Sequence, residues 1–259
     1  MKPHCEKSGI LRFRTIPEPL VRLFCFPYAG AGASIFRAWS KEFPAYVDVC
    51  GVQPPGKEER FSEMPARNMA VLLEGLAKSI VSECEIPFVF FGYSMGALLA
   101  FELARLFRRM ERMGPFLLAV AASRAPHVQR KRPRAYDLPD EEFLQVIRDL
   151  GGTTEDVLTD KEVVRLLFPV LRADFKIVET YRYHDDEPLS IPIVSFHGTK
   201  DTYVAIEEHR EWQRQTRSGF AEYSVSGDHF FINSNLGFVT KLLLKHINSL
   251  RLTPDLRMK

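Results

Sequence analysis

The sequence predicts an α/β fold in which helices cover both faces of a mostly parallel sheet. Three observations predict it. Short apolar runs alternate with segments of helical periodicity along most of the 259 residues. The run from Pro87 to Phe91 is apolar throughout, as expected of a strand buried on both faces of a parallel sheet. That run leads through a glycine-flanked serine into a strongly helical segment, and such alternation is typical of α/β sheets.

Six apolar runs bounded by turn residues are the expected strands. They are residues 20–26, 46–52, 87–91, 116–122, 191–196 and 220–225. Helices are expected over residues 36–43, 68–84 and 97–110 between them. Because one α/β domain can reach about 250 residues, we expect a single domain spanning 1–259.

Residues 127–187 break the strand–helix alternation and predict a helical lid inserted between two strands. One helix is expected to begin at Asp140 and to end at Gly151-Gly152. A second is expected from the capping-box sequence 159–162 towards Tyr181, with a kink near Pro169.

Composition excludes several classes of protein. The net charge of +2, without zinc-ligand spacing or basic–aromatic repeats, gives no indication of nucleic-acid binding or of a metal. Met1–Arg14 has no apolar core of a signal peptide, and no apolar stretch reaches the length of a membrane span. Cys25 and Cys50 lie in expected strands and are interpreted as reduced, buried thiols. We therefore expect a cytoplasmic protein without a membrane partner.

The candidate nucleophile is Ser94, within Gly92-Tyr93-Ser94-Met95-Gly96. A Gly-x-Ser-x-Gly sequence between a strand and a helix forms a sharp, strained turn, and small flanking residues let the serine hydroxyl project above the sheet. Both the preceding strand and the following helix are predicted here. A glycine-flanked turn with an incidental serine is the alternative, and the context favours the α/β-hydrolase fold.

A serine hydroxyl needs a base to take its proton, and histidine is suited to this because its pKa is about 6.5. Of the seven histidines, His229 lies just after the last expected strand, where this fold carries its base. The acid that orients the histidine is expected to be Asp201, which follows a strand and a glycine turn. Asp228 and Asp186 are the rivals, and an acid that only caps the turn is the alternative role for Asp201.

An oxyanion hole needs two backbone N–H donors. Met95, directly after the nucleophile, is expected to supply one at a helix N-terminus. The other is expected from the glycine-rich turn that follows the first strand, with Ala29 favoured over Tyr28. That turn lacks a P-loop lysine and does not complete a dinucleotide-binding motif.

Together these motifs resemble those of the type II thioesterases of polyketide and non-ribosomal peptide biosynthesis, over nearly the whole chain. The resemblance rests on residues 24–30, 53–60, 92–96, 138–143, 150–153, 171–174 and 228–231. Lys57 stands where the family commonly has arginine, and Asp228 stands where it often has glycine.

The resemblance implies a serine thioesterase that hydrolyses stalled or aberrant acyl groups from the phosphopantetheine arm of acyl or peptidyl carrier proteins. It implies Ser94, Asp201 and His229 as catalytic residues, Ala29 and Met95 as oxyanion donors, and no cofactor. We expect a monomer whose partners are carrier-protein domains. An acyltransferase or cyclising thioesterase, a medium-chain fatty acyl thioesterase, a carboxylesterase and a non-catalytic carrier-binding module are the alternatives.

Two further expectations concern the lid region. Apolar lid residues could line an acyl pocket or simply form core; the candidates are Phe143, Ile147, Leu167, Leu171 and Phe175. The basic stretch 124–134 could meet an acidic carrier protein by charge complementarity, although such a stretch is more often a solvated loop.

Overall fold

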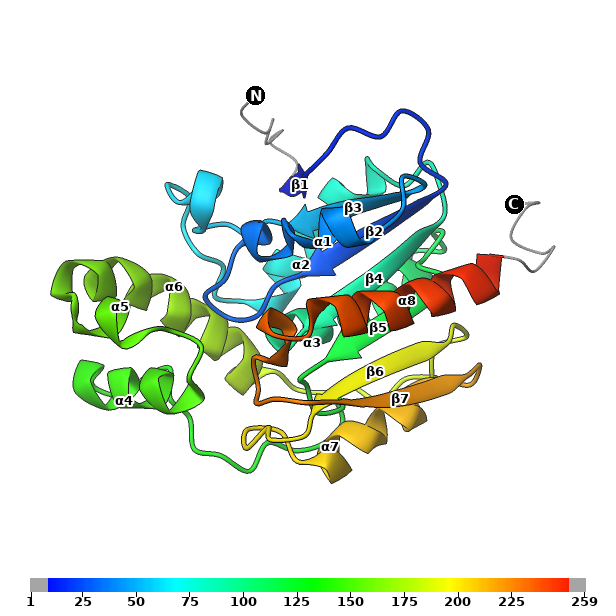
Figure 1. Cartoon of the computed structure of the whole chain (residues 1–259). Helices are drawn as coiled ribbons and strands as arrows, with labels where there is room; N and C mark the ends of the chain where they lie inside the picture. Colours follow the sequence, from blue (N-terminus) through cyan, green and yellow to red (C-terminus); the bar gives the residue numbers. More distant parts are fainter. Residues whose placement is uncertain (1–8, 252–259) are drawn as a thin grey trace.

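The computed structural model describes residues 9–251, and its centre is a seven-stranded sheet (Figure 1). The strand order is β1-β3-β2-β4-β5-β6-β7. The short edge strand β1 pairs antiparallel with β3, and every other pairing in the sheet is parallel. The bounds are β1 Ile10–Arg12, β2 Val21–Phe26, β3 Val47–Val52, β4 Phe88–Tyr93, β5 Leu117–Ala121, β6 Ile193–Gly198 and β7 Phe220–Val225. The predicted mostly parallel α/β sheet is confirmed.

Helices cover both faces of the sheet (Figure 1). The helices are α1 Trp39–Glu42, α2 Met69–Val81, α3 Met95–Arg109, α4 Asp140–Leu150, α5 Glu155–Thr159, α6 Lys161–Thr180, α7 Ile206–Arg210 and α8 Leu236–Arg251. Alternate strand residues face opposite layers: Phe24 packs with the α2–α3 side, whereas Leu23 packs with the α1–α8 side. Both faces are buried, which is why the strands are continuous apolar runs.

Several helix predictions were wrong in detail. The expected helix over 36–43 is a 3-10 turn, Ala33–Phe36, followed by the four-residue α1. Asp160, not Thr159, caps α6, because its carboxylate accepts from the backbone N–H groups of Glu162 and Val163 at 3.0 and 3.2 Å. The short helix α5 precedes it and was not predicted, nor were α8 and β1.

The inserted region between β5 and β6 carries three helices, α4, α5 and α6, and lies to one side of the sheet (Figure 1). Its apolar faces enclose a small core of their own, formed by Ala135, Phe143, Ile147, Leu158, Phe168 and Phe175. Gly151 ends α4 in a left-handed conformation, φ +77°, as its position in the sequence predicted.

Cys25 and Cys50 are buried free thiols, and Cys84 is a half-buried one; Cys5 lies outside the described residues. Over residues 9–251 no helix is long and apolar enough to cross a membrane.

Candidate active site

Ser94 lies at the turn between β4 and α3, with a strained backbone at φ +53° and ψ −114°. Its two glycines are required by close approach. A Cβ atom at Gly92 would overlap the Gly96 carbonyl and Ala97, and one at Gly96 would overlap the Phe26 carbonyl of β2. The turn is therefore packed directly against the neighbouring strand, and this fixes where the serine hydroxyl projects.

Three side chains predicted from the sequence form a hydrogen-bonded series at the ends of β4, β6 and β7. His229 Nε2 lies 3.1 Å from Ser94 Oγ, and His229 Nδ1 lies 2.9 Å from Asp201 Oδ2. Both His229 and Asp201 are buried, with side chains 7% and 0% exposed. An Nδ1–H that donates to the carboxylate leaves Nε2 free to accept the serine proton.

Asp201 also caps its own turn, so the two roles considered for it occur together. Its Oδ1 accepts from the N–H groups of Tyr203 and Val204 at 2.8 and 3.0 Å, while Oδ2 faces His229. Burial works to raise the pKa of Asp201, but the hydrogen bond and charge of His229 and the two N–H donors outweigh it and hold that pKa below its ordinary value. The carboxylate is therefore ionised and fixed in orientation.

Aromatic residues around His229 were not singled out by the sequence reasoning. The hydroxyl of Tyr93, which neighbours the serine in the turn, donates to the His229 carbonyl at 2.6 Å. The ring of Tyr203 lies 5.2 Å from the imidazole on one side, and that of Phe230 lies 5.2 Å away on another. The sequence did offer one signal for them, because each lies within two residues of Ser94, Asp201 or His229.

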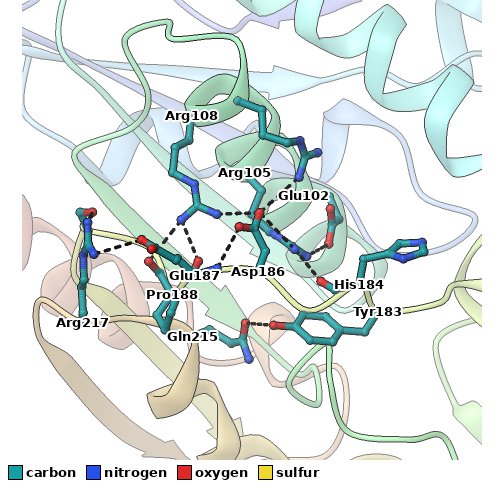
Figure 2. Close-up of polar contacts among 12 residues, drawn as sticks. Glu102, Arg105, Arg108, Tyr183, His184, Asp186, Glu187, Pro188, Gln215 and Arg217 are labelled. Atoms are coloured by element: carbon teal, nitrogen blue, oxygen red, sulfur yellow. Dashed lines mark hydrogen bonds and ion pairs between the residues drawn. The ribbon is translucent and has the colours of Figure 1, made fainter.

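The rival residues have other partners. Asp228 Oδ1 accepts from the Phe230 N–H at 2.8 Å, so it caps the turn and does not contact its neighbour's imidazole. Asp186 forms ion pairs with Arg108 at 2.7 Å and Arg105 at 3.4 Å, on the outer end of α3 (Figure 2). Among the histidines, His209 is fully buried and donates from Nδ1 to the Ser123 carbonyl at 2.9 Å.

The two expected oxyanion donors lie at the same cavity as Ser94. Ala29 and Met95 both line it, together with Tyr28 and His229. Met95 is the first residue of α3, where backbone N–H groups have no partner within the helix. Gly30, next to Ala29, has φ +83°, a left-handed conformation that glycine adopts without strain.

This first cavity is mostly apolar, and side chains of the inserted helices α4 and α6 form part of its wall. Ile147, Leu171 and Phe175 line it, as the sequence suggested. Phe143 does not line it: its ring is fully buried between those of Phe168 and Phe175, each 5.3 Å away. Leu167 lines a separate hollow beside the 28–32 loop. Leu150, Val178 and Phe230 complete the apolar wall and were missed.

A second cavity also reaches Ser94 and is rich in arginine. Its lining includes five arginines, Arg124, Arg130, Arg132, Arg134 and Arg182. Arg130 is paired with the buried Glu179 at 2.8 Å, and the Arg132 guanidinium lies over the Tyr203 ring at 4.5 Å. Burial, with Arg130 nearby, lowers the pKa of Arg124. Ser94 and Met95 line both cavities, so an apolar and a cationic space meet at the serine.

Within residues 9–251, no group of three or more His, Cys, Asp or Glu side chains is placed to hold a metal ion.

The fold and this serine–histidine–aspartate series define an α/β-hydrolase. A family model described as the thioesterase domain matches residues 21–250, so the chain belongs to the thioesterase family and is a thioesterase. The gramicidin S biosynthesis protein GrsT of Aneurinibacillus migulanus is 43% identical over 212 residues, which cover 82% of this chain and 83% of that protein.

Two further relatives are similar over almost the whole chain. Thioesterase PikA5 of Streptomyces venezuelae is 35% identical, over 96% of this chain and 89% of its own. The solved structure of the type II thioesterase BorB from the borrelidin biosynthetic cluster superposes with a TM-score of 0.85 at 32% identity, covering 93% of this chain and 98% of that one. The resemblance to type II thioesterases predicted from the sequence is confirmed.

Proposed function

We propose that this thioesterase is an editing enzyme, which hydrolyses stalled or aberrant acyl groups from the phosphopantetheine arm of carrier proteins. One observation carries the proposal: the hydrogen-bonded series of Ser94, His229 and Asp201 lies where an apolar cavity and a basic cavity meet. Similarity to the gramicidin S biosynthesis protein GrsT, to thioesterase PikA5 and to the type II thioesterase BorB of the borrelidin biosynthetic cluster supports the same function.

In the first half-reaction, the Ser94 oxygen attacks the thioester carbonyl while His229 Nε2 takes the hydroxyl proton. The backbone N–H groups of Ala29 and Met95 bind the negative oxygen of the tetrahedral intermediate. Asp201 keeps the imidazole in the required tautomer and stabilises its protonated form. When the C–S bond breaks, the imidazolium returns the proton to the departing thiolate.

In the second half-reaction, water replaces the serine hydroxyl. His229 takes a proton from the water, whose oxygen attacks the acyl-enzyme carbonyl, and the same N–H groups bind the second oxyanion. The C–O bond to Ser94 then breaks, and His229 returns the proton to the serine. The products are the free acid and the free carrier-protein thiol, and every proton is carried by residues already at the site.

The two cavities suit the two halves of such a substrate. The apolar cavity, which α4 and α6 of the inserted region help to line, suits an acyl chain. The basic cavity suits the phosphate-bearing arm, because arginine binds phosphate through several N–H groups at once. The basic stretch 124–134 would then meet the acidic surface of the carrier protein.

The test is a panel of acyl carrier proteins and acyl-coenzyme A thioesters offered to the wild type and to Ser94→Ala. We expect the wild type to release the acid and Ser94→Ala to lose about 10⁴-fold or more of the turnover number. Equal turnover by the two proteins would contradict the proposal.

A second arm tests the basic cavity. Arg124→Gln and Arg134→Gln should raise KM for acyl-carrier protein at low salt, with little effect on a short acyl ester that lacks the arm. Lys41→Gln, an exposed lysine on α1, is the matched charge control and should change neither. An unchanged KM in both arginine variants would show that the basic cavity does not contribute to substrate binding.

A further inference from the structure

We propose that Asp174 of α6 is a positioning residue, which holds the loop 28–32 in the conformation that aims the Ala29 N–H at the oxyanion. The proposal rests on Ala29 being an oxyanion donor, as assigned above. It gives the inserted helices a part in the chemical step that is separate from lining the acyl pocket.

The insertion is the part of the chain between β5 and β6, and the rest of the described chain, built around the sheet, is called the sheet domain. Asp174 reaches from the insertion into the sheet domain and is buried there. Its Oδ2 accepts from the Gly30 N–H at 2.7 Å and lies 2.6 Å from Lys57 Nζ. The side chains of Asp174 and Lys57 are only 6% and 3% exposed. A buried carboxylate that contacts both a cation and a backbone N–H has one stable orientation, because either contact alone would leave a buried charge or donor without compensation.

The contact is made at the peptide next to the proposed oxyanion donor. The Gly30 nitrogen belongs to the planar peptide unit that begins with the Ala29 carbonyl, so a hydrogen bond to that nitrogen restricts rotation at Ala29 itself. Gly30 also has φ +83°, a conformation that the loop must be held in. The Leu171 side chain, one turn earlier on α6, closes over Gly30 so tightly that a Cβ atom there would collide with it.

Lys57 has a distinct part in this arrangement. A lone carboxylate this close to the loop would oppose the negative charge that develops on the substrate oxygen. The Lys57 ammonium offsets that charge while leaving Asp174 able to accept from Gly30. Asp174 and Lys57 together therefore give the loop a hydrogen-bond acceptor while adding almost no net charge next to the substrate oxygen.

Holding α6 in place would be a simpler role for the pair, but α6 has other attachments nearby. Glu179 accepts from the N–H groups of Ala135 and Tyr136 at 2.8 and 3.1 Å. The Tyr181 hydroxyl, at the end of the helix, donates to Glu102 of α3 at 2.6 Å. The first contact fixes this half of the helix within the insertion and the second fixes it to α3, so what Asp174 adds is the attachment to Gly30 and Lys57.

The decisive comparison is between Lys57→Met/Asp174→Asn and Lys57→Met/Asp174→Leu. Both variants lack the ion pair and have side chains of similar size at residue 174, but only asparagine retains an oxygen that can accept from Gly30. The first readout is the rate at which an alkyl fluorophosphonate labels Ser94, since the phosphoryl oxygen must enter the oxyanion hole. The second is kcat and KM for an acyl-coenzyme A.

We expect the leucine variant to be about tenfold or more slower than the asparagine variant in both labelling and kcat, because losing a whole oxyanion donor costs about 10²–10³-fold. KM should differ by less than threefold between them. Arg22→Met/Asp48→Asn removes a buried ion pair of 3.1 Å on β2 and β3, and it is the matched control. It should lower the melting temperature and leave the labelling rate per folded molecule unchanged.

Equal labelling rates for the two Lys57→Met variants, at equal folded fraction, would overturn the proposal. Should the leucine variant not fold, amide hydrogen exchange of the wild type decides: the Gly30 N–H should be protected although it lies in a loop, and rapid exchange there would overturn the proposal. A wild type that is labelled at Ser94 yet hydrolyses no thioester would contradict the proposed function alone.

Discussion

The sheet domain and the helical insertion position their site residues by different means. In the sheet domain, Ser94, Asp201 and His229 follow the ends of buried strands, and the strained turn at Ser94 is held by backbone packed on backbone. In the insertion, amphipathic helices face the cavity with apolar side chains. Their links to the sheet domain include the buried carboxylate of Asp174, which contacts Gly30 and Lys57, and the hydrogen bond from Tyr181 to Glu102 of α3.

The difference shows that the residues proposed for the chemical step and the residues that line the acyl cavity can change independently. A residue fixed by strand register cannot move without disturbing the sheet, which suits groups that must be aligned within about 0.5 Å. A cavity wall made of helix side chains can change size by substitution and keep the helix. The contacts of Asp174 and Tyr181 are points where the two regions depend on each other. The C-terminal end of the insertion is fixed to α3 by a further network around Arg105 and Asp186 (Figure 2).

The largest expected effect belongs to the sheet domain. Asp201→Asn should lower kcat by about 10³–10⁴-fold, since the amide would favour the wrong tautomer of His229. Steady-state kinetics on an acyl thioester would measure it, with circular dichroism as the check on folding. A loss below tenfold would contradict the role proposed for Asp201.

The next effect tests whether the core of the insertion acts on stability alone. Phe143→Ala should destabilise the protein by about 3–5 kcal/mol, because the ring is fully buried among other aromatic rings. The kcat of the folded enzyme should change by less than threefold. Leu166→Ala, at a side chain 56% exposed, is the control and should stay within about 0.5 kcal/mol in urea unfolding. A large fall in kcat for fully folded Phe143→Ala would show that the core of the insertion also affects the chemical step, and not stability alone.

The pH dependence of stability should arise mainly in the sheet domain, at His209 of α7. Burial lowers the pKa of His209 to about 4. The unfolded chain takes up the proton near pH 6.5, so stability is complete above that pH and falls as the pH drops from about 6.5 to 4, by up to about 3 kcal/mol. The depressed pKa of Asp201 acts in the same direction at lower pH: its contribution is present above about 3.9 and is lost as the pH falls through its folded value.

Urea unfolding at pH 7, 5.5 and 4.5 measures this loss, and His209→Asn should flatten the dependence. A variant with the same slope as the wild type would exclude His209 as its source.

The smallest effect should be on acyl-chain preference. Ile147→Ala and Phe175→Ala enlarge the apolar cavity and should shift the preference towards longer chains, by about 1–2 kcal/mol or roughly tenfold in relative kcat/KM. Leu167→Ala is the matched control because that residue lines a different hollow. A shift of equal size in the control would show that the helices move as a unit and that no single side chain sets the preference.

The sequence was most informative where the backbone itself sets the structure. Gly92 and Gly96 flank a serine between an apolar run and a helix, and that pattern favours the sharp, strained turn that the structure shows. The parallel strands were found because burial on both faces makes them apolar throughout. The three-residue β1 and the five-residue α5 were missed because such short elements have no periodicity to read.

At the site, the sequence predicted which side chains the structure brings together at Ser94, and the catalytic roles of Asp201, His229, Ala29 and Met95 stay predictions until the variants are measured. It did not separate Phe143 from Ile147, because both lie on the apolar face of one helix. Which of them meets the cavity depends on how α4 packs against α6.

By itself, then, the sequence determined the fold class, the strained serine turn and the order of serine, acid and base. Burial and local conformation restrict which residue types can stand next to one another, so they can be recognised in a short stretch of sequence. Only the tertiary structure decided that a carboxylate of α6 reaches the Gly30 N–H and Lys57, that Phe143 is core, and that an apolar and a basic cavity meet at Ser94. The contacts of Asp174 join residues more than a hundred positions apart, and all three features depend on how the helices pack rather than on any local pattern.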